Sequence, residues 1–306
     1  MYESKFRQLC LLLLTLNLPL FLCLEGEHII GGEEAQAGQF NYHVAIEYSE
    51  LRYQPYICGG AIVDDRHVIT AAHCFVEEDG SGFRPQRTRI VAGVSDLEDR
   101  RGAVLRGVAK VYVPERYFRG EAATADIAVL QLEAPIGLGD NASEPIGPIR
   151  PAANARSYAG HLAVLTGFGT TSVAVYENAR GERQEATGRY SPRLRYAPAD
   201  VLTNEDCSRI KKELVAPSLV CAKMRRRRAP DSEPTGACSG DSGSPLVLGR
   251  STLIGVLVRS PFGCSELEAP AVYTRVSKFR TFIRLAMRDV TSARIRSHRY
   301  VSTRRF

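Results

Sequence analysis

The stretch from Thr235 to Pro245, TGACSGDSGSP, constrains this chain more than any other. Four small residues crowd around one acid, Asp241, and they are Gly240, Ser242, Gly243 and Ser244. Glycines let the backbone turn tightly and direct its N–H groups into a cavity. A serine in such a turn can present its hydroxyl beside two amide donors, which suits a nucleophile next to an oxyanion hole. Most Gly/Ser strings are simple turns, so this stretch alone leaves both interpretations open.

Two further stretches favour the reactive interpretation. Residues 69–74 read ITAAHC and contain His73, and residues 126–130 form an apolar run, DIAVL, that opens with Asp126. Serine is a weak nucleophile that needs a base, and a histidine base needs an acid to fix its tautomer. We therefore hypothesise a catalytic triad of His73, Asp126 and Ser242.

The order of these three residues resembles that of the chymotrypsin-like (trypsin-fold) secreted serine peptidases and differs from the Ser…Asp…His order of the α/β-hydrolases. The resemblance covers about residues 29–290. It implies that Ser242 is the nucleophile, that His73 is the general base and then the acid, and that Asp126 orients His73. It also implies an oxyanion hole formed by the N–H groups of Gly240 and Ser242. Protein or peptide substrates, no metal and no organic cofactor are expected, and a serpin-type inhibitor is a partner to consider.

The resemblance further implies an all-β fold of two packed six-stranded antiparallel β-barrels with a C-terminal helix. We expect barrels over about 29–140 and 150–276, and a helix over about 277–288. Alternating apolar residues and recurrent turn residues agree with an all-β chain. Expected strand segments are 40–46, 58–63, 68–70, 89–91, 108–113 and 126–132 in the first barrel, and 161–170 and 194–202 in the second.

The connecting segments carry their own expectations. Residues 135–151 are rich in Pro and Gly and are expected to link the barrels, and residues 171–193 are expected to form a mobile surface loop. Residues 204–212 suggest a short helix. Ser277 is expected to cap the last helix, whose apolar face would pack on the second barrel. That face comprises Phe279, Phe282, Ile283, Ala286 and Met287.

The basic tail, residues 291–306, is expected to be loose. Its five arginines supply most of the net charge of +6, which argues against a nucleic-acid-binding protein. Four further arginines, 225–228, suggest a convertase site, a contact for acidic substrates or a solvated loop, and we favour the loop.

The first 28 residues are expected to be a signal peptide followed by a very short propeptide. Lys5 and Arg7 precede an apolar stretch, 9–24, that Asn17 and Pro19 interrupt, so it suits a secretory signal better than a membrane span. A retained signal anchor is the weaker alternative. We therefore expect a secreted, extracellular protein without a membrane span, with an N-glycosylation acceptor at Asn141.

Six cysteines remain after the signal segment, and an even number in a secreted chain indicates disulfides. Six cysteines allow 15 pairings. The resemblance selects three of them: Cys58–Cys74, Cys207–Cys221 and Cys238–Cys264. No CxxC or HxxxH spacing occurs, which disfavours a metal centre.

Ile29 opens the sequence IIGG, and in this family such an isoleucine becomes the new N-terminus after cleavage. Its ammonium group is then expected to pair with Asp241 and so order the oxyanion hole. The residue before it, His28, replaces the usual Arg or Lys, so a trypsin-like activator would not cut there. How this bond is cut is left open.

The residue six positions before the nucleophile lies at the floor of the specificity pocket in this family. Trypsins require Asp there, but this chain has Gly236, and the other deep wall position holds Ala271. A buried cationic side chain without a partner is costly, so we expect cleavage after apolar residues. One extra residue leaves the register open, and either Ser260 or Pro261 in place of the family Gly would narrow the entrance, which favours a chymotrypsin-like or elastase-like preference. Glu268 is an alternative partner for a basic substrate.

The pocket wall departs from the family, because Val258-Arg259-Ser260 stands where relatives often have Ser-Trp-Gly. Val258 removes a hydroxyl partner for Asp126. The altered wall, His28 and the basic tail motivate an alternative function: a weakly catalytic or non-catalytic secreted homologue that acts as an interaction protein. The complete triad favours the serine endopeptidase.

Overall fold

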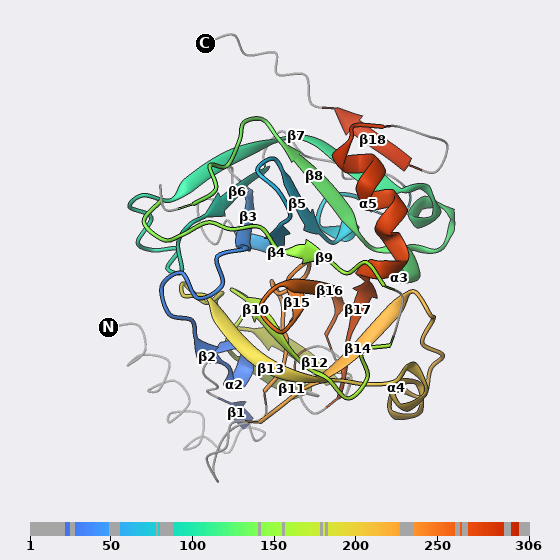
Figure 1. The fold of residues 1–306 in the computed structure, drawn as a ribbon. Coiled ribbons are helices and arrows are strands. Elements are labelled where there is room, and N and C mark those ends of the chain that lie inside the picture. Colours follow the sequence, from blue (N-terminus) through green and yellow to red (C-terminus); the bar gives the residue numbers. More distant parts are fainter. Residues whose placement is uncertain are drawn as a thin grey trace.

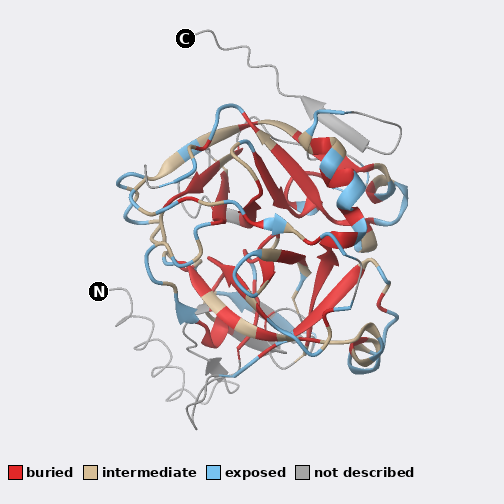
Figure 2. Cartoon of the chain, viewed as in Figure 1, coloured by how far each residue is buried: buried red, intermediate tan, exposed pale blue. Residues whose placement is uncertain are grey.

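A computed structural model describes residues 22–24, 28–48, 56–77, 79, 88–139, 142–154, 157–177, 180, 183–226, 235–260, 264, 269–290 and 295–299. Two closed six-stranded antiparallel barrels lie one above the other in Figure 1. This arrangement confirms the expected fold class. Buried residues fill the interiors of both barrels, whereas the connecting loops are largely exposed (Figure 2).

The first barrel has the strand order β7-β6-β3-β4-β5-β8 and closes through the pairing of β7 with β8. Every strand segment expected in this part of the sequence falls on one of these strands. Their bounds are β3 (His43–Tyr48), β4 (Tyr56–Ile62), β5 (His67–Thr70), β6 (Thr88–Ala92), β7 (Val104–Pro114) and β8 (Ala128–Leu132).

The second barrel has the order β10-β15-β16-β17-β14-β13 and closes through the pairing of β10 with β13. Burial alternates strictly along β13, as the period of two in a strand requires. The strand bounds are β10 (Leu162–Gly167), β13 (Arg195–Val201), β14 (Leu219–Met224), β15 (Pro245–Leu248), β16 (Thr252–Arg259) and β17 (Ala271–Arg275).

Two short strands extend the second barrel at its periphery. β2 (Glu33–Glu34) pairs with β13, although it precedes the first barrel in the sequence. β9 (Arg150–Pro151), at the end of the expected linker, pairs with β16 in parallel. The segment that follows His28 is therefore attached to the second barrel.

Residues 171–193 do not form the single loop that we expected. They contain β11 (Val173–Glu177) and β12 (Arg183–Thr187), which pair as an antiparallel hairpin. β1 (Leu22–Leu24) pairs with the outer edge of β11. The expectation of a loop was wrong because the strand-forming run at 173–176, VAVY, is surrounded by polar residues that dilute its signal.

The expectation of a loose C-terminal tail is also wrong for one segment. β18 (Ile295–Arg299) pairs antiparallel with β7, at the top of Figure 1. This pairing uses backbone hydrogen bonds at an edge strand, which impose little pattern on the sequence.

Helical segments are short and connect the strands. They are α2 (His28–Gly31), η1 (Ala72–Cys74), η3 (Glu115–Arg119), α3 (Ala122–Ala125), α4 (Asn204–Lys211), η4 (Val276–Phe279) and α5 (Arg280–Met287). α4 confirms the helix expected around Cys207, and Thr203 caps it by accepting a hydrogen bond from the Asp206 N–H at 2.9 Å. Within the described chain, no helix is both long enough and apolar enough to span a bilayer.

The C-terminal helix has the expected buried face but not the expected neighbour. α5 lies against β8 of the first barrel (Figure 1), and its buried residues Phe282, Ile283 and Ala286 share a core cluster with Val111 and Leu130 of that barrel. The prediction that this helix packs on the second barrel is therefore wrong, because a helical apolar stripe defines which face is buried but not against which element. Ser277 lies inside η4 and does not cap α5, so the capping prediction is wrong as well.

The three disulfides form as the resemblance implied. Cys58 bonds Cys74, Cys207 bonds Cys221, and Cys238 bonds Cys264. The first of these joins β4 to η1, the 3₁₀ turn that carries His73. It therefore fixes one wall of the candidate site.

Candidate active site

The pairing of two strands brings His73 and Asp126 together. Thr70, at the end of β5, lies opposite Ala128, at the start of β8. His73 lies three residues after the end of β5, and Asp126 lies two residues before the start of β8. Antiparallel pairing therefore places both residues at the same end of the first barrel.

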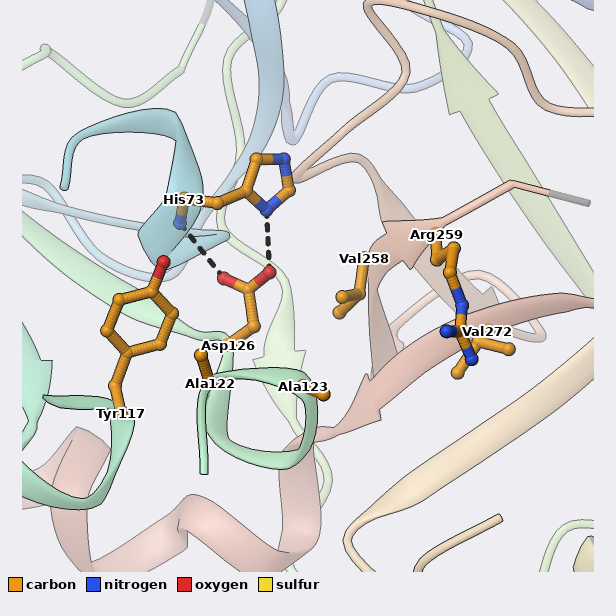
Figure 3. A pocket seen from close by; sticks show the side chains of 8 residues that line it. All are labelled: His73, Tyr117, Ala122, Ala123, Asp126, Val258, Arg259 and Val272. Atoms are coloured by element: carbon orange, nitrogen blue, oxygen red, sulfur yellow. Dashed lines mark hydrogen bonds and ion pairs between the residues drawn. The ribbon is translucent and has the colours of Figure 1, made fainter. Parts of the chain in front are cut away.

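The two residues form a hydrogen-bonded pair (Figure 3). Nδ1 of His73 lies 2.6 Å from Oδ2 of Asp126, and the backbone N–H of His73 donates to Oδ1 at 3.0 Å. Asp126 is buried, and the hydroxyl of Thr274 donates to its backbone carbonyl at 2.5 Å. These contacts fix the orientation of the imidazole and leave its Nε2 available for proton transfer.

The environment of His73 adjusts its basicity. Burial lowers the pKa of the imidazole, but the negative charge and hydrogen bond of Asp126, together with Glu77, outweigh burial and raise the pKa above its ordinary value. Such a histidine accepts a proton more readily than a free imidazole, as a general base requires.

The loop that carries Ser242 packs against the strands that lead to His73. The N–H of Gly59 in β4 donates to the carbonyl of Ser242 at 2.8 Å. Gly243 has a φ of +75°, and a Cβ there would lie 2.2 Å from Oγ1 of Thr70. Only glycine permits so close an approach between the two barrels. Within the described residues, Ser242 and His73 share no hydrogen bond, so the complete triad stays a prediction.

The backbone around Ser242 has the features of an oxyanion hole. Gly240 has a φ of +90°, and a Cβ there would lie 2.7 Å from the ring of Tyr190. The N–H groups of Asp241 and Gly243 donate within the protein. Those of Gly240 and Ser242 have no acceptor among the described residues, so they can donate to a substrate oxygen.

Asp241 lies in a tightly enclosed site in the second barrel. Its carboxylate accepts hydrogen bonds from the N–H groups of Gly169 at 2.9 Å and Cys238 at 3.0 Å. A Cβ at Gly167 would lie 2.0 Å from Oδ1, so the glycines on either side of Phe168 make room for this acid. Burial raises the pKa of Asp241 to about 7, against the effect of its two hydrogen bonds.

Ile29 is fully buried in the same barrel core, with a φ of +23°. Positive φ is a true outlier for a β-branched residue and indicates backbone strain. The next residue, Ile30, accepts a hydrogen bond from the N–H of Gly236 at 2.9 Å. Among the described residues, Ile29 and Asp241 share no hydrogen bond or ion pair, so their pairing stays a prediction.

The expected specificity residues have the expected character but are not collected into one described pocket. Gly236 and Ala271 are buried, and Ser260 is half-buried. A pocket of about 240 Å³ instead lies directly beside His73 and Asp126 (Figure 3). Sequence reasoning had identified Val258 and Arg259 as an altered wall but missed the other residues that line this pocket: Tyr117, Ala122, Ala123 and Val272.

Several predicted features fall outside the described residues or find another role. Asn141 and Glu268 lie outside the described residues. Arg225, the first of the four arginines, pairs with Asp200 at 2.6 Å on the surface. The sulfurs of Cys58 and Cys74 lie within 4.8 Å of a nitrogen of His73, but a disulfide does not supply the thiolates that a metal centre needs.

Comparisons with known proteins identify the fold and the family. A family model described as Trypsin matches residues 29–283. The chain belongs to the trypsin family. The fibrinolytic enzyme, isozyme C, of Lumbricus rubellus is 27% identical to it over 265 residues, which span 83% of this chain and 98% of that protein.

Solved structures of trypsin-family proteins support the same fold. Neuropsin, a serine protease expressed in the limbic system of mouse brain, is 24% identical, with a TM-score of 0.64 over 84% of this chain and 98% of that one. The scabies mite inactivated protease paralogue S-D1 is 23% identical, with a TM-score of 0.65 over 86% of this chain and 98% of that one. At these identities the likeness concerns the fold alone, and the set includes an inactivated protease.

Proposed function

We propose that this trypsin-family chain is a secreted serine endopeptidase that hydrolyses peptide bonds through an acyl-enzyme. The observation that carries the proposal is the pair of hydrogen bonds between His73 and Asp126 at the end of the first barrel. The tight packing of the Ser242 loop against Gly59 and Thr70 supports it, because it brings the candidate nucleophile to the same end.

In the proposed reaction, Oγ of Ser242 attacks the peptide carbonyl while Nε2 of His73 accepts its proton. The imidazolium, stabilised by Asp126, then donates that proton to the leaving amine. The N–H groups of Gly240 and Ser242 stabilise the oxyanion, and each such donor contributes about 3 kcal/mol to the barrier reduction. Water, deprotonated by His73, then attacks the acyl-enzyme and releases Ser242.

We further propose that cleavage before Ile29 activates the enzyme. The buried carboxylate of Asp241 has hydrogen bonds but no described cationic partner, and burial raises its pKa to about 7 despite those hydrogen bonds. A free ammonium on Ile29 would supply a positive charge, and cleavage would release the backbone strain at that residue. N-terminal sequencing of the active protein should therefore find Ile29.

The proposed substrates carry an apolar residue at the cleaved bond. Gly236 and Ala271 are small, neutral and buried, so neither offers a charge to a basic side chain. A peptide library tests this preference, which cleavage mainly after Arg or Lys would overturn. Secretion and glycosylation at Asn141 belong to the same proposal, and the three disulfides support an oxidising location.

Hydrolysis of apolar peptide substrates tests the catalytic part of the proposal. Wild-type protein that begins at Ile29 should turn over these peptides, and with an activated ester it should release the alcohol product in an initial burst, because the acyl-enzyme accumulates. The Ser242→Ala variant, folded to the same extent by circular dichroism, should show no burst. Equal and negligible turnover by both proteins would refute the proposal.

The alternative function is a weakly catalytic or non-catalytic homologue that acts as an interaction protein. One observation favours it: Ser242 and His73 share no hydrogen bond within the described residues. Hydrogen bonds of this kind are often long in proteins without substrate, and they tighten in the complex. The endopeptidase is therefore the better-supported proposal.

A further inference from the structure

The pocket beside His73 has an uneven distribution of charge. Alanine and valine side chains form much of its wall, and at one side stands the guanidinium-bearing Arg259. Figure 3 places Arg259 and Val272 across from His73 and Asp126, with Val258 between them. A side chain that enters the pocket therefore meets an apolar surface and then a cation.

The position of Arg259 is fixed by the barrel. It is the last residue of β16 and lies opposite Val272 of β17, immediately after a register shift that begins at Leu257. Its side chain is 53% exposed, so it stands at the rim and is accessible to a ligand.

Glu213, the described partner of Arg259, also contacts Lys211. Oε1 of Glu213 lies 2.5 Å from Nη2 of Arg259 and 3.8 Å from Nζ of Lys211. Among the described residues, this one carboxylate faces two positive groups, which leaves an excess of positive charge at this rim. The Arg259–Glu213 pair is about half exposed, and exposed pairs are weak enough to exchange partners.

Asp126, the acid at the other side of the pocket, is not available to contact a ligand. Both oxygens of Asp126 are occupied by hydrogen bonds from His73, and its side chain is buried. Charges on the adjacent η3–α3 segment are also paired, Arg116 with Glu121 and Arg119 with Glu115. Arg259 is therefore the charged group that a ligand would meet at the open side.

We propose that this pocket is a substrate subsite for an acidic side chain. The carboxylate pairs with Arg259, and the methylene groups lie against Val258 and Val272. Arginine suits this role because its planar guanidinium can bind a carboxylate through two parallel hydrogen bonds. The proposal rests on the peptidase function, and it assigns the enzyme to peptides with an acidic residue close to an apolar cleavage residue.

A set of peptides with one fixed apolar cleavage residue tests the proposal. Each of the four flanking positions on either side carries Glu, Gln or Lys in turn, and kcat/KM is measured at low salt. Wild type should prefer Glu over Gln at one position by about tenfold, as expected for a charge-assisted contact. Arg259→Gln should reduce this ratio to about one. Arg259→Glu should favour Lys instead.

Two further variants make the test specific. Glu213→Gln removes the competing carboxylate and should increase the Glu/Gln ratio. Arg119→Gln is the matched control, because it removes an exposed, paired arginine that does not line the pocket, and it should leave the ratio unchanged. A wild-type ratio of about one at every position, or an unchanged ratio in Arg259→Gln, would overturn the proposal.

Binding separates this proposal from the peptidase function itself. Fluorescence anisotropy of the same labelled peptides on the Ser242→Ala background should show tighter binding of the Glu peptide, and loss of that preference in Ser242→Ala/Arg259→Gln. Absence of hydrolysis together with an Arg259-dependent binding preference would refute the peptidase and keep the subsite. Hydrolysis without any preference for Glu would keep the peptidase and refute the subsite.

Discussion

The buried acid beside the candidate nucleophile should make the uncut chain less stable as pH rises. Burial raises the pKa of Asp241 to about 7, from an ordinary value of 3.8. Between these two values the folded chain retains a proton that the unfolded chain has lost. The contribution of Asp241 to the free energy of unfolding therefore falls as pH rises from 3.8 to about 7 and levels off above that.

The size of this effect follows from the same two pKa values. Their separation of about three pH units corresponds to about 4 kcal/mol of lost stability at full ionisation. More than half of this loss falls between pH 5 and pH 8. Cleavage before Ile29 should abolish most of the loss, because the new ammonium can pair with the ionised carboxylate.

Equilibrium urea unfolding of wild type and Asp241→Asn between pH 5 and pH 8 measures the effect. The chain is prepared with the His28–Ile29 bond intact, which N-terminal sequencing verifies. The wild-type curve should fall more steeply than that of Asp241→Asn. Asp200→Asn is the flat control: the hydrogen bond with Arg225 lowers the pKa of Asp200 below 3.8, so its contribution is constant between pH 5 and pH 8 and its curve should run parallel to that of wild type. Parallel curves for wild type and Asp241→Asn would refute the reasoning.

Three further predictions concern the first barrel. Burial lowers the pKa of His73, but the opposing effects of Asp126 and Glu77 are larger, so the net pKa is raised. The acid limb of kcat/KM should therefore have its midpoint above the ordinary value of 6.5. A midpoint below 6.5 in the pH profile would contradict this. Asp126→Asn should lower kcat by about 10⁴-fold, the loss known for this substitution in a trypsin, because the imidazole is left in the wrong tautomer; a loss below tenfold would show that the pair is not catalytic. Replacing Cys58 and Cys74 together by Ser should cost about 3 kcal/mol in urea unfolding, because a bridge over a sequence separation of 16 is removed, and an unchanged midpoint would count against a stabilising disulfide.

Much of the candidate site could be predicted because its signals are local. His73 and Asp126 each lie within a short, recognisable stretch next to a strand, and their hydrogen bonds form as the resemblance implied. The need for glycine at positions 240 and 243 follows from backbone geometry, because both have a positive φ and close neighbours that leave no room for a side chain. The three disulfides followed from the resemblance rather than from their spacing.

The remaining features depend on tertiary arrangement that a single sequence does not encode locally. The apolar stripe on α5 was visible, but its position against the first barrel was not. The pairing of β18 with β7 depends on backbone bonds at an edge and imposes no side-chain period. The orientation of Arg259 depends on an irregular register between β16 and β17, which no pattern in the sequence marks.

Reaction with a fluorophosphonate probe tests the central claim most directly, because such a probe labels only a serine that a neighbouring base activates. Protein that begins at Ile29 should be labelled, and mass spectrometry should locate the adduct on Ser242. Ser242→Ala and His73→Ala should remain unlabelled although both fold. Absence of labelling in correctly cleaved wild type, or equal labelling in His73→Ala, would contradict the account of a serine activated by His73.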